Sequence, residues 1–133
     1  MEKFSKERKT ETMATILTAD DAAFMRKVIK DTLNKNGFPD VVEAVDGADA
    51  VAKFDEFNPD LVILDITMPN MDGLEALKAI KAKNPAANCV MCSAMGQEAM
   101  VIDAIQNGAK DFIVKPFKPE RIMKTVTTIL GNP

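Results

Sequence analysis

The chain has 133 residues, of which 47% are hydrophobic, so it can form one compact domain with a core but not a second domain of useful size. Its net charge of −3 excludes an overall field that would attract nucleic acid or an anionic membrane surface. No apolar run of about 18 residues could span a bilayer, and the N-terminus has no apolar signal segment, so we expect a cytoplasmic protein. The sequence contains no histidine, so its chemistry must use carboxylates, hydroxyls and lysines.

Residues 1–12 are polar and rich in charge, and we interpret them as a flexible leader before a single domain of residues 13–133. After the leader, short apolar runs alternate with longer segments of helical period. This alternation predicts βα repeats around a parallel sheet. The five runs predicted to form strands are residues 14–19, 41–45, 61–65, 88–93 and 111–115.

Between these runs, apolar residues recur at the spacing of a buried helix face, which predicts five helices. The predicted faces consist of Phe24, Met25, Val28, Ile29 and Leu33; Val51, Phe54 and Phe57; Leu74, Leu77 and Ile80; Met100, Val101, Ala104 and Ile105; and Ile122, Met123, Val126, Ile129 and Leu130. Three central strands are apolar almost throughout, as in strands covered by helices on both faces. The fold class is therefore predicted to be α/β with a doubly wound sheet.

Two cysteines, Cys89 and Cys92, form a C-x-x-C pattern inside the fourth predicted strand. Residues three apart on a strand point to opposite faces, so this pair is badly placed to chelate one metal or to form a disulfide. We favour buried structural thiols over a redox pair, since free cysteine behaves as a small hydrophobe.

Polar residues stand at the ends of the predicted strands. The first strand runs into Asp20 and Asp21, the third ends at Asp65, the fourth at Ser93 and the fifth at Lys115. The carboxyl ends of parallel strands form one rim, where doubly wound sheets bind ligands. Each residue alone could be a helix cap, a turn residue or a surface charge. Five such groups on one rim are better explained by a functional site.

The three carboxylates need a positive partner, because two unit charges about 5 Å apart repel by roughly 3 kcal/mol at an effective dielectric of 20. A hard divalent cation bound by carboxylates, a carbonyl and water would offset that repulsion, and Mg²⁺ is the natural candidate. Lys115 would add positive charge from the opposite side.

Four motifs carry a family resemblance: TADD at 18–21, LVILDITMPNMDG at 61–73, CSAM at 92–95 and KPF at 115–117. With these motifs, residues 14–130 resemble the CheY-like receiver domains of two-component response regulators. The resemblance implies a flavodoxin-like fold, with a five-stranded parallel sheet in the order 2-1-3-4-5 and five helices; CheY itself is a usual illustration of that order. It also implies a cis peptide bond before the proline of the KPF motif.

The resemblance further implies a role for each site residue. Asp65 would be the phosphoacceptor, attacking phosphorus to give an aspartyl phosphate, with a histidine kinase as donor. Asp21 and Asp65 would bind Mg²⁺ directly, Asp20 through water, and Thr67 through its backbone carbonyl. Lys115 would contact the phosphoryl oxygens and neutralise their charge.

Ser93 and Phe112 occupy the positions of the family's switch. The hydroxyl would move toward the phosphoryl group and the ring would fill the vacated space, changing the face made by the fourth helix, fifth strand and fifth helix. The alternative for Phe112 is an ordinary core residue. The best-known chemotaxis members carry tyrosine there, so a switch at Phe112 would depend on packing alone. Thr67 and Met95 stand at two variable positions that the family links to the lifetime of the phosphoryl group.

We therefore expect a stand-alone, monomeric response regulator, acting in chemotaxis through contact with a downstream protein and not with nucleic acid or membrane. It would catalyse only its own phosphorylation and dephosphorylation. Alternatives within the class are a phosphorelay intermediate and a receiver excised from a longer regulator. A Mg²⁺-dependent phosphatase with an aspartate nucleophile would need an acidic residue where Thr67 stands, and the glycine-rich motifs of nucleotide-binding proteins do not occur.

Overall fold

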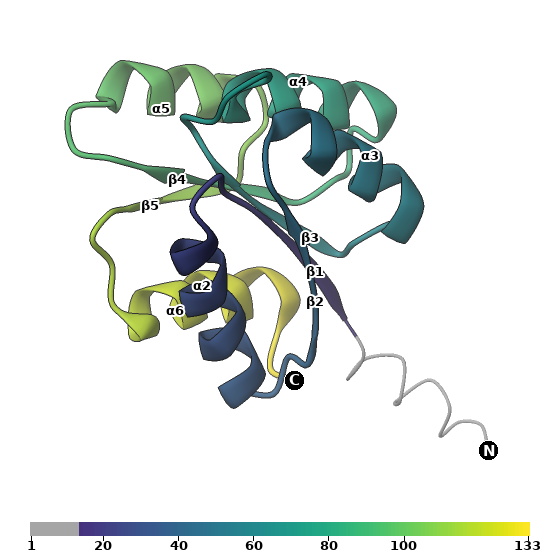
Figure 1. The fold of residues 1–133 in the computed structure, drawn as a ribbon, viewed down its shortest axis with the longest axis vertical. Helices are drawn as coiled ribbons and strands as arrows, with labels where there is room; N and C mark the ends of the chain where they lie inside the picture. The colour runs from purple at the N-terminus through teal and green to yellow at the C-terminus, as the bar shows by residue number, and fades with distance from the viewer. Residues whose placement is uncertain (1–13) are drawn as a thin grey trace.

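The computed structural model describes residues 14–133, so the predicted leader, residues 1–12, lies outside the described residues. Within this range strands and helices alternate as the sequence pattern predicts (Figure 1). The elements are β1 (Thr15–Ala19), α2 (Ala23–Lys35), β2 (Asp40–Ala44), α3 (Gly47–Phe57), β3 (Leu61–Asp65), α4 (Gly73–Lys83), β4 (Cys89–Ser93), α5 (Glu98–Gln106), β5 (Asp111–Val114) and α6 (Pro119–Leu130). None of these helices is long and apolar enough to cross a membrane.

The five strands form one parallel sheet in the order β2-β1-β3-β4-β5, which confirms the predicted topology. From β1 the chain continues to β2 at one edge of the sheet, whereas from β3 it continues through β4 to β5 at the other edge. The direction of the strand order therefore reverses between β1 and β3. Helices α2 and α6 cover one face, and α3, α4 and α5 cover the other (Figure 1). The crevice at the carboxyl ends of β1 and β3 is therefore the place where such a fold binds a ligand.

Each face of the sheet has its own apolar core, because successive side chains of a strand point to opposite faces. On β1, Ile16 lies in the core beneath α2 and α6, and Leu17 lies in the core beneath α3, α4 and α5. Both side chains are fully buried, and each contributes roughly 1.5–3 kcal/mol of hydrophobic free energy. The same alternation places the free thiols of Cys89 and Cys92 in opposite cores, which confirms that both are buried structural residues.

Several apolar residues of the predicted helix faces are exposed instead. Phe24 is 73% exposed, since it stands nine positions before the buried Leu33, which is about half a turn away around the helix. Exposed too are Phe57 in the last turn of α3, and Met100 and Ile105, which lie at the two edges of the buried face of α5. An apolar residue that is close in sequence to the buried residues of a helix can therefore still be exposed to solvent.

Candidate functional site

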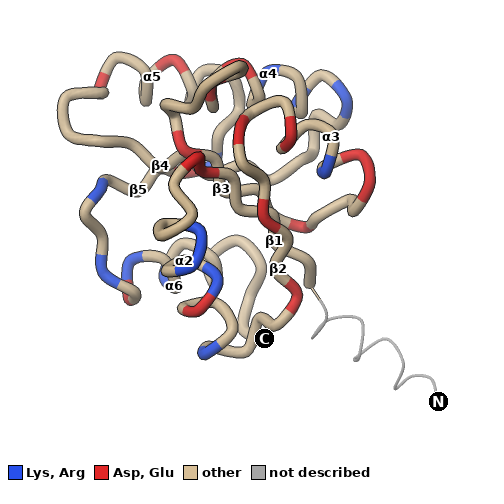
Figure 2. Tube along the Cα trace, viewed as in Figure 1, with Lys and Arg blue, Asp and Glu red and all other residues tan. Residues whose placement is uncertain are grey.

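The polar residues at the strand ends come together at one rim. Asp20 follows β1, Asp65 ends β3 and Ser93 ends β4. Lys115 stands one residue beyond the end of β5, and not inside the strand as its sequence suggests. Figure 2 shows acidic segments gathered where β1 and β3 end, next to β4. The predicted convergence of these side chains is thus what the fold produces.

Three aspartates form a compact carboxylate cluster. One oxygen from each of Asp20, Asp21 and Asp65 lies within 4.8 Å of the other two. Asp20 and Asp65 are buried and Asp21 is exposed, so the cluster opens to solvent on one side. Carboxylate oxygens at this spacing are the ligands that a hard divalent cation such as Mg²⁺ prefers, so the donor set fits the predicted ion.

Lys115 supplies a positive charge inside the rim. Its Nζ lies 3.1 Å from Asp65 Oδ1 and 3.2 Å from Asp20 Oδ2. Its backbone N–H donates to the carbonyl oxygen of Ser93 at 2.8 Å, which ties the chain after β5 to the end of β4. The peptide bond from Lys115 to Pro116 is cis, as the resemblance implies. One ammonium therefore bridges two of the three carboxylates.

The charges of the rim are only partly balanced. Burial raises the pKa of Asp65, and the Asp20 carboxylate raises it further, against the opposing effect of Lys115. For Lys115, burial lowers the pKa, but the carboxylates of Asp65 and Asp20 outweigh burial and the pKa is raised overall. Lys115 therefore stays positive, while the ionised form of Asp65 needs more positive charge than Lys115 provides.

Asp20 accepts hydrogen bonds from the N-cap residue and from the first turn of α2. The backbone N–H of Ala22 donates to Asp20 Oδ1 at 2.9 Å, and Arg26 Nη1 donates to the Asp20 carbonyl oxygen at 2.7 Å. The Arg26 Nε also donates to Glu43 Oε1 at 3.0 Å, so a mostly buried guanidinium links β2, α2 and the first aspartate. Arg26 escaped the sequence analysis, since a helical arginine is ordinarily a surface residue.

The loop between β3 and α4 is held close to Asp65 by its composition. Gly73 begins α4 against the end of β3, and a Cβ at that position would lie 2.0 Å from the Asp65 carbonyl oxygen. The preceding Asp72 forms a capping box with Glu75, which fixes the start of the helix. Asn70 has a positive φ and donates to Asp46 Oδ2 at 2.7 Å, a bond that lowers the pKa of Asp46. The asparagine and glycine of the long motif are thus explained by backbone geometry.

Gln97 connects the loop that follows the predicted switch residue Ser93 with Thr67, two residues after the predicted phosphoacceptor. Ser93 is buried and does not cap α5, whose N-cap residue is Gln97. The Gln97 side chain instead donates to Thr67 Oγ1 at 2.8 Å and accepts from the Ala94 N–H at 2.6 Å. The predicted metal-binding role of the Thr67 carbonyl stays a prediction. Gln97 escaped the sequence analysis because its partner is 30 residues away.

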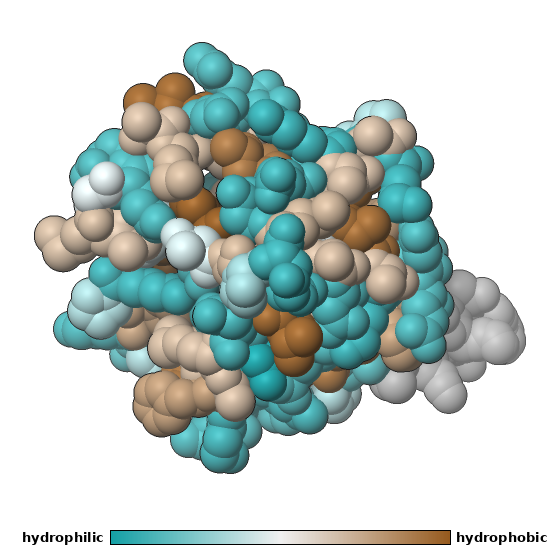
Figure 3. Space-filling model, turned by 45° about the horizontal axis from the view of Figure 1, so that its top comes forward, coloured by the Kyte–Doolittle hydropathy of each residue, from teal (hydrophilic) through white to brown (hydrophobic). Residues whose placement is uncertain are grey.

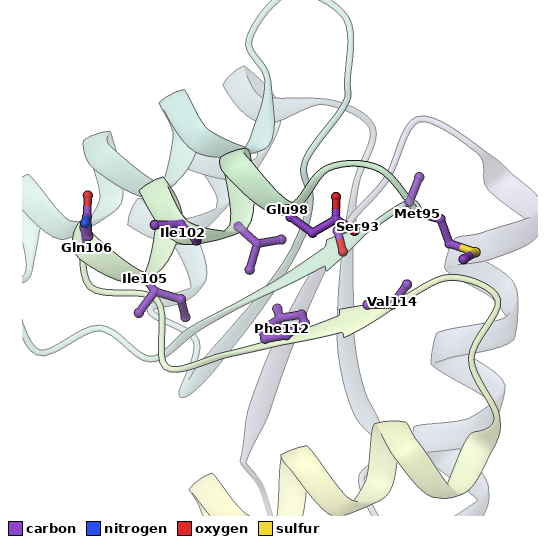
Figure 4. A pocket seen from close by; sticks show the side chains of 10 residues that line it. Ser93, Met95, Glu98, Ile102, Ile105, Gln106, Phe112 and Val114 are labelled. Carbon is purple, nitrogen blue, oxygen red and sulfur yellow. The ribbon is translucent and has the colours of Figure 1, made fainter.

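Phe112 is an exposed residue, so the alternative of an ordinary core phenylalanine is wrong. The residue is 37% exposed, and it lines a groove of about 610 Å³ between α5 and β5. Figure 4 shows Phe112 and Val114 on β5 facing the side chains of α5, with Ser93 at the end of β4. On the face that Figure 3 displays, apolar residues lie in separate groups among hydrophilic ones. The groove joins the end of β4 to the outer surface.

These features agree with the sequence comparison. Residues 16–127 match the response regulator receiver domain family, so the chain belongs to that family. Receiver domains bind Mg²⁺ at an acidic pocket, and this chain has an acidic cluster of Asp20, Asp21 and Asp65 at the carboxyl rim of its sheet.

Relatives with high sequence identity to this chain are chemotaxis proteins, which narrows the kind of receiver domain to the chemotaxis type. The chain is 61% identical to the chemotaxis protein CheY of Bacillus subtilis (strain 168) over 116 residues, which cover 87% of this chain and 97% of that protein. It is 51% identical to the chemotaxis protein CheY of Thermotoga maritima over 114 residues, covering 86% and 95% of the two chains. The function that these relatives support is that of a chemotaxis-type response regulator.

Solved structures give the same fold. The crystal structure of a CheX-CheY-BeF₃-Mg²⁺ complex from Borrelia burgdorferi contains a chain with a TM-score of 0.83 and 37% identity, with 87% of this chain and 88% of that chain covered. The receiver domain of NtrX from Brucella abortus has a TM-score of 0.82 and 35% identity, with 86% and 97% covered.

Proposed function

We propose that Asp65 accepts a phosphoryl group from the phosphohistidine of a histidine kinase. A carboxylate oxygen of Asp65 forms the new P–O bond while the P–N bond breaks, and the imidazole leaves with that electron pair and takes up a proton. The observation that supports this best is a buried carboxylate 3.1 Å from the Lys115 ammonium and within 4.8 Å of two further carboxylates. Such a carboxylate is held in place and is poorly balanced in charge until more positive charge arrives.

The neighbouring residues have complementary roles in this proposal. Asp21 and Asp65 would bind Mg²⁺ directly, Asp20 would bind it through water, and the Thr67 carbonyl would complete the protein ligands. When bound, the ion supplies positive charge that offsets the repulsion between the carboxylates and the incoming phosphoryl oxygens. Lys115, with its Nζ 3.1 Å from Asp65 Oδ1, orients and neutralises those oxygens. The chain catalyses only its own phosphorylation and dephosphorylation.

The output of the proposed reaction is a change at the groove between α5 and β5. Carrying a two-state equilibrium from 1:99 to 99:1 takes about 5.5 kcal/mol, and a charge-assisted hydrogen bond from Ser93 supplies roughly 1.5–3 kcal/mol. Lys115 and Mg²⁺ must therefore contribute as well. The Phe112 ring, which lines the groove, moves into the space that Ser93 leaves, and this packing change alters the α5–β5–α6 face.

The proposed partner of that face is a downstream protein in the chemotaxis pathway. This chain would bind it as a monomer in the cytoplasm. The groove is lined mainly by apolar side chains, among them Ile102, Ile105 and Val114, as suits a protein contact. The related CheY from Borrelia burgdorferi is in a complex with CheX, a protein, together with BeF₃ and Mg²⁺. That complex supports a protein partner for this chain.

The proposal is tested by incubating the protein with acetyl phosphate and Mg²⁺ and measuring its intact mass. The wild type is expected to gain one phosphoryl group, and Asp65→Asn and a sample with excess EDTA are expected to gain none. Asp31→Asn serves as the matched control, because Asp31 is an exposed aspartate of α2 that pairs with Lys27. An unmodified wild type, or a full adduct on Asp65→Asn, would refute the assignment.

A further inference from the structure

Gln97 joins the two loops that border the phosphoacceptor. Its Nε2 donates to Thr67 Oγ1, two residues after Asp65, and its Oε1 accepts from the backbone N–H of Ala94, directly after Ser93. Both bonds come from one planar amide, with lengths of 2.8 and 2.6 Å. A single side chain therefore connects the loop after β3 with the loop after β4.

The position of Gln97 favours this bridging role over a capping role. An N-cap side chain ordinarily accepts hydrogen bonds from the first turn of its own helix, and that of Gln97 makes no such bond to α5. It points back toward the loops instead. Among residues 14–133, the bond from Ala94 to Gln97 is the one side-chain hydrogen bond that Ala94, Met95 and Gly96 make, and Met95 and Gly96 form a turn. Met95 is 79% exposed, so the bridge adds a restraint on the chain after Ser93 that packing of Met95 does not supply.

We propose that Gln97 is a positioning residue that holds Ser93 in its unphosphorylated place and so opposes modification of Asp65. The inference rests on the proposed function, in which Ser93 moves toward the phosphoryl group. Ala94 cannot follow Ser93 unless its bond to Gln97 breaks, because the other end of that amide is fastened to Thr67. An interaction made in only one of two states shifts their equilibrium by its whole free energy.

The size of the effect follows from the net free energy that one hydrogen bond contributes. Such a bond typically contributes about 0.5–1.5 kcal/mol, which corresponds to roughly a three- to tenfold change in an equilibrium constant. Removing the Gln97 amide should therefore strengthen binding of a phosphoryl mimic by about that factor. A side chain with a merely structural role would instead lower the unfolding temperature and leave binding unchanged or weaker.

The test is a double-mutant cycle with beryllofluoride and Mg²⁺ as the probe. Dissociation constants are measured by isothermal titration calorimetry, which suits a chain without tryptophan or tyrosine. Gln97→Ala is expected to bind about three- to tenfold more tightly than the wild type. Thr67→Val removes one end of the bridge and is expected to gain less. The double variant should bind no more tightly than Gln97→Ala, since both changes break the same bridge.

The control is Asp31→Asn, because Asp31 is an exposed residue of α2 that pairs only with Lys27 among the described ion pairs; wild-type affinity is expected. Unchanged or weaker binding by Gln97→Ala, an equal gain in Asp31→Asn, or additive gains in the double variant would overturn the proposal. If Gln97→Ala does not fold, Thr67→Val decides the matter by the same comparison. Failure of the wild type to bind the probe, or full binding by Asp65→Asn, would refute the proposed function itself.

Discussion

Replacing Asp65 by asparagine is expected to make the protein more stable when no divalent cation is present. At an effective dielectric of about 20, Asp20 and Asp21, with oxygens within 4.8 Å, each repel the Asp65 carboxylate by about 3.5 kcal/mol. Lys115, at 3.1 Å, attracts it by about 5.4 kcal/mol. The balance is about 1.6 kcal/mol of repulsion; burial of the charge increases it, and solvent near Asp21 reduces it. We therefore expect a gain of about 1–2 kcal/mol.

The gain should depend on pH in a defined direction. The pKa of Asp65 is raised above its ordinary value of 3.8, chiefly by burial, so the folded state favours the protonated carboxyl. The stability linked to that proton is fully present below the ordinary pKa and is lost as the pH rises through the raised pKa of the folded state. Asparagine does not titrate, so the difference between the two proteins should be small in acid and largest near neutral pH.

Urea unfolding followed by far-UV circular dichroism measures the difference. Asp31→Asn is the control and should stay within about 0.5 kcal/mol of the wild type at each pH. Mg²⁺ at about 100 times its dissociation constant should add about 2.7 kcal/mol to the wild type and much less to Asp65→Asn. A variant less stable than the wild type at neutral pH without cation, or a gain of equal size in acid, would refute the reasoning about the carboxylate cluster.

Three further predictions concern residues around the site. Phe112→Ala should leave labelling by acetyl phosphate intact and weaken binding of the downstream protein, since the ring is 37% exposed; lost labelling would make Phe112 structural. Gly73→Ala should lose at least about 2 kcal/mol in urea unfolding, because its Cβ would meet a carbonyl oxygen at 2.0 Å. Gly96 has a φ of +92°, but a Cβ added there would meet no atom within 4 Å, so Gly96→Ala should lower the free energy of unfolding by only about 1 kcal/mol. Equal losses of stability in the two glycine variants would contradict the steric argument. Burial raises the pKa of Cys89 to about 11 and of Cys92 to about 12. A thiol reagent at about pH 8 should therefore label both cysteines in urea and neither of them rapidly in the folded protein. Fast labelling of the folded protein would count against their burial.

Sequence reasoning succeeded where a residue's position depends on its own strand. Asp20, Asp65 and Ser93 could be assigned to one rim, because the period of the apolar runs gives the strands and parallel strands share an end. Sequence reasoning failed where the hydrogen-bond partner of a residue lies on another element of the fold. Neither the bond from Gln97 to Thr67 nor that from Arg26 to the Asp20 carbonyl has a local signature.

The sequence by itself determined the α/β alternation, the residues that gather at the carboxyl rim and, through its motifs, the receiver family. Those features follow from local periodicity and from strand direction, which the chain carries everywhere along its length. Only the tertiary structure decided that Phe112 lies in an exposed groove, that Phe24 points to solvent and that Gln97 bridges the two loops. Exposure and side-chain pairing depend on which elements pack beside a residue, and packing joins parts of the chain that are distant in sequence.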